Sequence, residues 1–268
     1  MTLHLVAPPR VWRVALDGVP LPAWRYFSTV TSTNDAAWSW AEQGAAEGCL
    51  VTADEQTAGR GRRGRRWHTP PRVAVAVSVV VRPLPGEAAH LPRYAAWAAL
   101  AMAEALERWG VAVALKWPND LLLRDAKIGG ALAEARWQGE RVAGAVLGVG
   151  VNVRQGSAPR PETLDYPAGD VETLTGKSLP RPALVAAFWD RWAWWRSRIG
   201  SGAFVAAWQQ RLAWRGQRVE VTTPDGVTFQ GVLQGLDARG RLHVRTAAGL
   251  RAVSHAGTVR QLTDAKSQ

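Results

Sequence analysis

The residues best suited to chemistry in this chain lie in one short segment, AGRGRRGRRWHTP at 58–70. Three glycines separate its arginines, which are Arg60, Arg62, Arg63, Arg65 and Arg66. Guanidinium groups present paired donors to phosphate or carboxylate oxygens, and glycines let a backbone approach a ligand closely. The composition predicts a loop that wraps an anion. A solvated basic loop or an RNA-binding arginine–glycine segment would use the same residues, and both alternatives stay open at this point.

A second polar group follows in KWPNDLLLRDAKIGG, 116–130. Its candidate site residues are Lys116, Asn119, Asp120 and Lys127. Lysines that enter otherwise apolar strands need anionic partners, so this segment is the natural companion of the arginine loop. A simple hairpin with solvent-facing lysines is the alternative.

Two further segments carry isolated polar residues. TSTND at 31–35 can cap a helix that we expect over 33–43, with Asp35 three residues after Ser32 and Gly44 at its end. GVGVNV at 148–153 is an apolar strand in which Asn152 is the only polar side chain.

The arginine loop lies between two predicted strands. CLVTADEQ, 49–56, runs into it, and RVAVAVSVVV, 72–81, leaves it with alternating valines on one face. After Pro92 the apolar residues take helical spacing up to Gly110, and one face of that helix should lie on the sheet.

The middle of the chain reads as short strands with tight turns, the pattern of an antiparallel meander up to residue 153. Residues 154–180, rich in Pro, Gly and Ser, predict a connection. A helix follows, with Phe188, Trp192, Trp195 and Ile199 on one apolar stripe, and a further helix begins after Gly202. Helices beside mainly antiparallel strands indicate the α+β class.

From Gln217 onward the chain changes to closely spaced short strands and turns. This pattern predicts a small SH3-like β-barrel. We therefore expect two domains, a catalytic or ligand-binding domain over 1–214 and a barrel domain over 215–268.

Composition limits the class of protein. Lys and Arg number 33 against 22 Asp and Glu, for a formal charge of +11, which suits phosphates, nucleic acid or acidic proteins as partners. The single cysteine, Cys49, cannot form an internal disulfide. No apolar run approaches the roughly 20 residues of a membrane span, and the first residues lack a signal-peptide pattern. We expect a cytoplasmic protein with no membrane partner.

Five motifs together resemble the biotin protein ligase family. They are STND at 32–35, EQTAGRGRRGRRW at 55–67, KWPNDL at 116–121, KIGG at 127–130 and GVGVNV at 148–153. They stand in the family's order, and the resemblance continues through the helical region into the small barrel, from about residue 24 to residue 263. The resemblance implies the mixed, mainly antiparallel catalytic fold of that family, which is similar to class II aminoacyl-tRNA synthetases.

The resemblance also implies a two-step reaction. Biotin and ATP form biotinyl-5'-AMP and pyrophosphate, with Mg²⁺ expected, and a lysine of a biotin carboxyl carrier protein or domain then takes the biotinyl group. Both steps gather negative charge on phosphate and carboxylate oxygens, so cationic donors and positioning can supply most of the catalysis.

Family analogy distributes roles among the candidate residues. Lys127 and Arg62 are implied as catalytic. The implied biotin-binding residues are Ser32, Thr33, Asn34, Gln56, Arg60, Gly61, Arg62 and Lys127. The implied ATP- or adenylate-binding residues are Arg62, Arg65, Trp67, Lys116, Asn119, Asp120 and Asn152. Asp120 is also the expected Mg²⁺ ligand.

Three alternatives compete with this interpretation: a lipoate protein ligase, which shares the adenylation chemistry, a basic RNA-binding module, and a scaffolding protein. Some members of the family carry an N-terminal helix-turn-helix, but STN already stands at 32–34, so we expect no specific DNA binding. A homodimer through sheet edges is compatible with the sequence.

Overall fold

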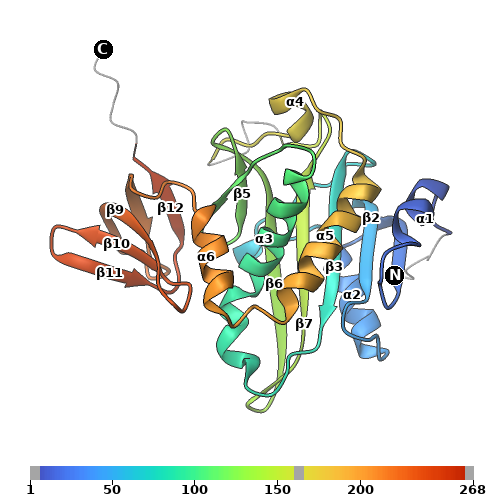
Figure 1. The fold of residues 1–268 in the computed structure, drawn as a ribbon, viewed down its shortest axis with the longest axis horizontal. Coiled ribbons are helices and arrows are strands. Elements are labelled where there is room, and N and C mark those ends of the chain that lie inside the picture. Colours follow the sequence, from blue (N-terminus) through green and yellow to red (C-terminus); the bar gives the residue numbers. More distant parts are fainter. Residues whose placement is uncertain (1–6, 160–165, 263–268) are drawn as a thin grey trace.

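The computed structural model describes residues 7–159 and 166–262. Residues 160–165 of the predicted connection, residues 1–6, over which we expected no signal peptide, and residues 263–268 lie outside the described residues. Figure 1 shows a large sheet covered by helices, with a smaller group of strands beside it that the helix α6 joins to the rest.

The described residues form three α-helices before residue 108 and three after residue 170. The α-helices are α1 (Arg10–Leu16), α2 (Thr33–Glu42), α3 (Tyr94–Glu107), α4 (Val171–Thr175), α5 (Arg181–Arg196) and α6 (Gly202–Gln210). The strands of the large sheet are β1 (Trp24–Val30), β2 (Leu50–Gln56), β3 (Ala74–Val81), β4 (Ala114–Lys116), β5 (Asp120–Leu123), β6 (Ala126–Gln138) and β7 (Arg141–Asn152). The strands of the small sheet are β8 (Arg218–Thr222), β9 (Thr228–Leu236), β10 (Leu242–Thr246), β11 (Gly249–Val253) and β12 (Thr258–Gln261).

The large sheet has the order β1-β2-β3-β7-β6-β5-β4. Only β1 and β2 pair in parallel, joined by α2, and the remaining neighbours are antiparallel. The predicted meander is present as β4 to β7. With the second, five-stranded antiparallel sheet, this arrangement confirms the predicted α+β class.

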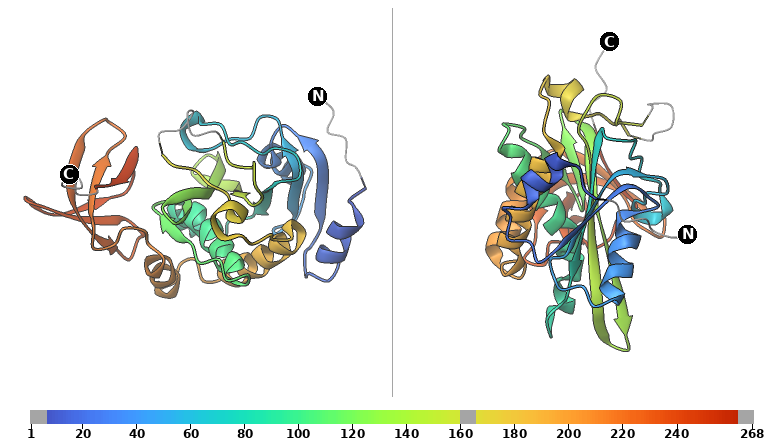
Figure 2. Two further views of the ribbon diagram at one scale, coloured as in Figure 1. Left: turned by 90° about the horizontal axis from the view of Figure 1, so that it is seen from above. Right: turned by 90° about the vertical axis from the view of Figure 1, so that its right-hand side faces the viewer.

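The two faces of the large sheet bear different layers. The larger apolar core lies between the sheet and α1, α3 and α5, while a smaller core lies under α2. Figure 2 shows the same asymmetry, with α2 alone on its side of the sheet. Part of the α2 face is therefore left free of helices.

Strand β3 and helix α3 are buried more completely than the sequence predicted. Strand β3 begins at Ala74 and is buried on both faces, because Val77 and Val79 pack in the larger core while Val80 packs under α2. Helix α3 is buried on nearly all sides rather than on one face, because α5 packs over it. A helix sandwiched in this way has no polar stripe to reveal its orientation.

The tryptophan-rich stripe of α5 is core packing, as predicted. Trp192 is 2% exposed and stacks on Trp97 of α3 with ring centroids 4.6 Å apart. The indole N–H of Trp97 donates to the backbone oxygen of Trp192 at 3.0 Å. Trp189 stacks on the other side at 4.8 Å. Three large rings thus hold α5 against α3 and the sheet.

The two sheets meet at a defined junction. The indole N–H of Trp117 donates to the oxygen of Gly240 at 3.0 Å, and the amide of Leu236 donates to the side-chain oxygen of Gln209 at 2.8 Å. Leu115 of β4 bridges to Leu212 after α6. The division of the chain at 214/215 stays a prediction.

None of the helices in the described part of the chain is long and apolar enough to cross a membrane.

The packing predicts a contrast between neighbouring tryptophans of α5. Trp192→Ala should lower the free energy of unfolding by about 3–5 kcal/mol, because it removes a buried ring from a stacked triplet. Trp194, which is 41% exposed, is the matched control, and its replacement by alanine should cost only about 0.5 kcal/mol. Urea denaturation followed by circular dichroism measures both. Equal losses would contradict the packing described for α5.

Candidate active site

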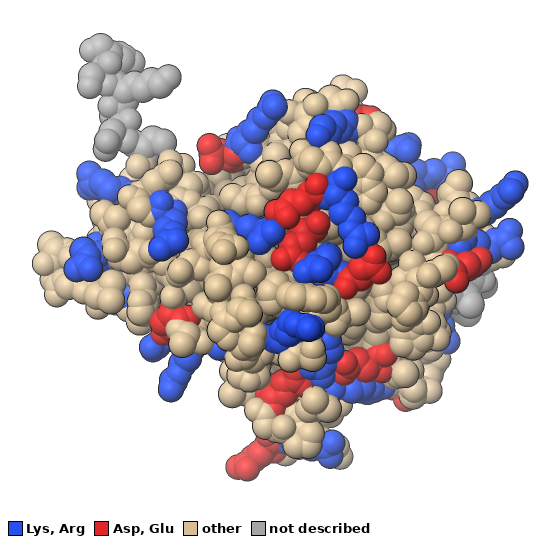
Figure 3. Space-filling view, in the orientation of Figure 1, with Lys and Arg blue, Asp and Glu red and all other residues tan. Residues whose placement is uncertain are grey.

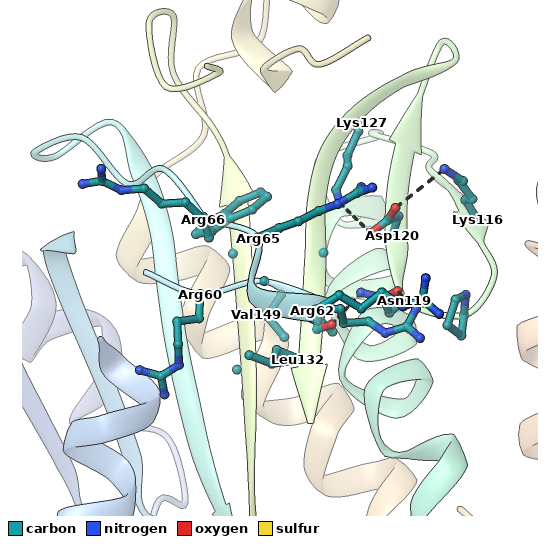
Figure 4. A pocket seen from close by; sticks show the side chains of 18 of the residues that line it. Arg60, Arg62, Arg65, Arg66, Lys116, Asn119, Asp120, Lys127, Leu132 and Val149 are labelled. Atoms are coloured by element: carbon teal, nitrogen blue, oxygen red, sulfur yellow. Dashed lines mark hydrogen bonds and ion pairs between the residues drawn. The ribbon is translucent and has the colours of Figure 1, made fainter. Parts of the chain in front are cut away.

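One cavity of about 850 Å³ gathers the predicted site residues on the α2 face of the large sheet. All fourteen line it: Ser32, Thr33, Asn34, Gln56, Arg60, Gly61, Arg62, Arg65, Trp67, Lys116, Asn119, Asp120, Lys127 and Asn152. They come from the start of α2, the end of β2, the arginine loop and the segment from β4 to β7, which lie far apart in the sequence. Figure 4 shows part of this lining.

The floor of the cavity is made by alternating glycines in β7. Val149 and Val151 point into the larger core, so Gly148 and Gly150 face the opposite side, where the cavity lies. A Cβ at Gly148 would collide with the side chain of Asn34, and one at Gly150 with the ring of Trp67. In the GVGVN pattern the valines therefore pack in the core, while the glycines leave the cavity side of the strand without side chains. Residue spacing alone predicts an apolar strand with one asparagine here and does not show that the glycines form this floor.

A hydrogen-bonded group closes the end of the cavity next to α2. The side-chain oxygen of Gln56 accepts from the backbone N–H of Thr33 at 2.8 Å and from its hydroxyl at 3.0 Å. Ser78 donates to Asn34 at 2.6 Å, and the amide group of Asn34 donates to Glu134 at 2.6 Å. Ser78 and Glu134 were not predicted, because neither belongs to a motif that sequence alone singles out.

Arg60 is held in ion pairs rather than left free. Its guanidinium donates to both carboxylate oxygens of Asp35, at 2.6 and 2.7 Å, and lies 3.3 Å from Glu134.

Ser32 does stand at the start of α2, but its side chain makes no capping hydrogen bond. The capping box predicted for Ser32 and Asp35 is therefore wrong, because Asp35 binds the arginine loop instead.

The other arginines of the loop contact different parts of the site. Arg62 donates to Asn119 at 3.1 Å, and Asn119 donates to the oxygen of Ala131 at 2.7 Å. Burial lowers the pKa of the Arg62 guanidinium. Figure 4 shows Arg65 pointing toward Lys127 and Asp120 and Arg62 pointing toward Asn119, whereas Arg60 and Arg66 point away from this group.

Lys116 and Lys127 converge on one carboxylate. Nζ of Lys127 lies 2.7 Å from Asp120, and Nζ of Lys116 lies 4.0 Å from it (Figure 4). Gly130 makes room for this pair, since a Cβ there would lie 3.2 Å from the Asp120 carboxylate. The expected anionic partner of the lysines is therefore Asp120. Among the described residues that line the cavity, it is the only carboxylate.

Lys116 also lies over aromatic rings. Its Nζ is 4.4 Å from the ring centroid of Tyr166 and 5.6 Å from that of Trp214. Burial lowers the pKa of Lys116, and the charge of Asp120 opposes this effect. Tyr166, which stands alone in a weakly patterned connection, gave no signal in the sequence.

Two polar atoms in the described part of the lining are buried without a hydrogen-bond partner. One is Nε1 of Trp67 and the other is Oδ1 of Asn152, whose amide group donates to Gly169 at 3.0 Å. Buried polar groups are normally paired. A donor and an acceptor left without partners in a cavity are suited to a polar ligand.

The small sheet also contributes to the cavity. Residues 256–259, at the start of β12, line it, and Gly257 lies so close to the guanidinium of Arg63 that a Cβ would come within 2.8 Å. Arg63 has a positive φ of 58°, which a non-glycine residue rarely adopts. The loop thus touches both sheets.

Charge is distributed unevenly over the molecule. In Figure 3 the surface over α3 and α5 has acidic and basic groups side by side. Ion pairs that join these helices to neighbouring segments include Arg108 with Asp190 and Arg211 with Glu107. The small sheet carries mainly basic groups in the same view. In the part of the chain that the structure describes, no cluster of three or more His, Cys, Asp or Glu residues could hold a metal ion.

The glycine floor generates a test that needs no ligand. Gly150→Ala should push Trp67 outward and open the arginine loop, so that trypsin cuts within 60–66 about ten times faster, equivalent to roughly 1.4 kcal/mol of lost protection. Gly144→Ala is the control, because it lies on the same face of β7 and its Cβ would be 3.5 Å from Arg82. If both variants were cut at the wild-type rate, the floor would not support the loop.

Comparison with known proteins agrees with this geometry. Residues 26–152 match the Biotin/lipoate A/B protein ligase family, and residues 216–259 match the Biotin protein ligase C terminal domain. The Biotin--[acetyl-CoA-carboxylase] ligase of Paracoccus denitrificans is 32% identical over 234 residues, covering 83% of this chain and 94% of its own. The Bifunctional ligase/repressor BirA of Bacillus spizizenii is 30% identical, covering 85% and 71%.

Solved structures of similar shape include two ligases. Biotin protein ligase from Aquifex aeolicus, in complex with biotin and ATP, superimposes with a TM-score of 0.76 at 24% identity, over 90% of this chain and 100% of its own. This likeness concerns the fold. The Leishmania major enzyme, in complex with biotinyl-5-AMP, has a TM-score of 0.62 at 25% identity, over 91% and 99%. On the matched regions and on identities of 30% and above over most of both chains, this chain belongs to the biotin protein ligase family.

Proposed function

We propose that the chain activates biotin with ATP to biotinyl-5'-AMP and passes the biotinyl group to a lysine of a biotin carboxyl carrier protein. The observation that carries this proposal is the convergence of four cationic side chains on a cavity lined by a single described carboxylate. They are Arg62, Arg65, Lys116 and Lys127. This excess of positive charge suits a substrate that brings both a carboxylate and phosphates.

The α2 end of the cavity would hold the biotin ring. The ureido group has two N–H donors and one carbonyl acceptor, and Ser32, Thr33, Asn34 and Gln56 supply hydroxyls and amides of both kinds. Leu132 and Gly148 offer apolar surface beside them. The stem and backbone of Arg60, with Gly61, would cover the acyl chain, while Asp35 and Glu134 hold the Arg60 head.

The reaction centre would lie near Lys127. In the first step the biotin carboxylate oxygen attacks the α-phosphorus, a new oxygen–phosphorus bond forms, and pyrophosphate leaves. Lys127, with Arg62, would bind the oxygens that gain charge as this happens. Asp120 holds the Lys127 ammonium in place at 2.7 Å, and Asn119 holds Arg62 at 3.1 Å.

The nucleotide would occupy the other half of the cavity. Lys116 and Arg65 would bind its phosphates, and the unpaired atoms of Trp67 and Asn152 would bind its remaining polar groups. Mg²⁺ commonly uses one or two protein carboxylates together with substrate phosphates. Asp120 would supply the protein carboxylate. When bound, the ion would neutralise phosphate charge.

The arginine loop would also limit loss of the activated acid. It spans the cavity between β2 and β3 and contacts the small sheet through Arg63. An adenylate held under such a cover is shielded from water until the carrier lysine arrives. In the second step that amine attacks the acyl carbon, an amide forms, and AMP leaves with the bonding electrons.

The finer assignments belong to the same proposal. The acceptor would be the carrier of a biotin-dependent carboxylase, in keeping with the printed name of the Paracoccus relative. Cytoplasmic location is supported by the single buried cysteine. Pairing of two chains through a sheet edge is consistent with β1 having only β2 as a strand neighbour among the described residues.

Pyrophosphate exchange tests the first step. The wild type should exchange labelled pyrophosphate into ATP only when biotin is present, and Lys127→Ala should reduce the rate by about 10²–10³-fold, the usual effect of removing a charge-stabilising donor. Lys177→Ala is the control, since Lys177 binds backbone oxygens of Trp109 and Gly110 outside the cavity. Exchange supported by lipoate but not biotin would favour the lipoate ligase reading. No exchange with either acid would contradict adenylation.

The pH dependence tests Lys116. Because burial lowers its pKa, the ammonium loses its proton at a lower pH than an exposed lysine, and ATP binding should weaken along an alkaline limb below pH about 10.5. Lys116→Arg should move this limb upward, since guanidinium stays protonated throughout. The KM for ATP, measured from pH 7 to 10, shows the shift; identical limbs in both proteins would exclude Lys116 as the titrating group.

A further inference from the structure

A buried ion pair lies behind the arginine loop, outside the cavity. Asp54 of β2 and Arg181 at the start of α5 are 2.8 Å apart, and each side chain is only 9% exposed. The hydroxyl of Tyr26 donates to the other carboxylate oxygen of Asp54 at 2.6 Å. Removal of one partner from such a pair leaves a buried charge without compensation, at a large cost. The geometry therefore holds all three groups in fixed positions.

This pair joins the two ends of the loop. Asp54 stands two residues before Gln56, where the chain leaves β2, and its backbone oxygen accepts from the N–H of Arg72 at 3.0 Å. Arg181 donates to the backbone oxygen of Ala74, the first residue of β3, at 3.1 Å. One guanidinium on α5 thus connects the strand that enters the loop with the strand that leaves it.

The ion pair is sheltered by the N-terminal helix. Trp12 of α1 is 2% exposed and packs on the ring of Tyr26, with centroids 5.7 Å apart. The same indole lies 5.8 Å from the guanidinium carbon of Arg181. Exclusion of water strengthens the attraction between Asp54 and Arg181. The region that matches the ligase family begins only at residue 26, after this helix.

We propose that Asp54 and Arg181 are positioning residues that set the spacing of the loop ends and thereby the closure of the loop over the adenylate. Neither residue lines the cavity, so they act through the backbone of 56–72. Gln56 is the nearest link: its N–H donates to the oxygen of Thr69 at 3.2 Å across the base of the loop. The catalytic part of this inference rests on the proposed function, and the structural part does not.

Hydrogen exchange tests the structural part. Amides within 56–72 that are bonded across the loop include those of Gln56, Gly61, Trp67 and Arg72. In Arg181→Met their exchange, followed by mass spectrometry, should accelerate roughly tenfold or more, while exchange in β6 and β7 stays unchanged.

Arg196→Met provides the matched control. Arg196 lies on the same helix and forms partly buried ion pairs with Glu47 and Glu87, away from the loop. It should lower thermal stability to a similar extent but leave loop exchange at the wild-type rate. Equal acceleration of loop exchange in the two variants would reduce the Asp54–Arg181 pair to a general stabilising contact and overturn the proposal.

Release of biotinyl-AMP tests the catalytic part. With carrier absent, Arg181→Met should release the adenylate into solution roughly 10–100-fold faster than Arg196→Met, because small displacements of positioning groups have effects of this size. The KM for biotin should change less than the release rate. Faster loop exchange with unchanged release would overturn the link to closure. Absence of any adenylate in the wild type would instead refute the proposed function and leave the exchange result standing.

Milder variants cover the case in which Arg181→Met does not fold. Tyr26→Phe removes one hydrogen bond from Asp54 without changing charge. Arg181→Lys keeps the charge but replaces the two separate nitrogens that bond Asp54 and Ala74 by a single one. Both should accelerate loop exchange selectively, by a smaller factor than Arg181→Met. Wild-type exchange in both would contradict the proposal.

Discussion

The site depends on an excess of cationic groups held partly out of water around one carboxylate. Asp120 lies within ion-pair distance of Lys127 and, at longer range, of Lys116, and it is the only carboxylate among the described residues of a cavity that several arginines also line. Such an arrangement is costly for the protein alone. Its cost is offset when a substrate supplies phosphate and carboxylate oxygens, so the same electrostatic imbalance accounts for both affinity and catalysis.

The rest of the fold keeps these cations in place. Valines of β7 pack in the larger core, so the glycines between them form a floor that cannot shift without disturbing that core. The stacked rings of α3 and α5 make the opposite layer rigid. Against this support the loop divides its arginines among different tasks: Arg60 bonds to Asp35, Arg62 to Asn119, and Arg66 to the backbone of Thr57.

Much of this architecture could be predicted from the sequence, for physical reasons. The antiparallel meander followed from apolar runs separated by turn residues, and the small sheet from closely spaced strands. The fourteen site residues stood in motifs dense in charge and glycine, and all of them line one cavity, although their individual roles remain predictions.

Features that depend on tertiary contacts could not be predicted. Asp35 looked like a capping residue because local spacing cannot reveal Arg60, 25 positions later, as its partner. Helix α1 gave no distinctive pattern, since Trp12 and Leu16 are its only buried residues. Ser78, Glu134 and Tyr166 each lie in segments whose local sequence has an ordinary structural explanation. Contacts made by single polar residues across a fold leave no periodic signal.

The central claim is that the cavity makes and retains an activated acid. Native mass spectrometry of the purified protein after incubation with biotin, ATP and Mg²⁺, followed by removal of free ligands, measures this most directly. We predict one biotinyl-5'-AMP retained per chain, lost when a carrier domain is added as the carrier gains biotin. A chain that retains only unreacted biotin or ATP, with no adenylate under any of these conditions, would contradict the account.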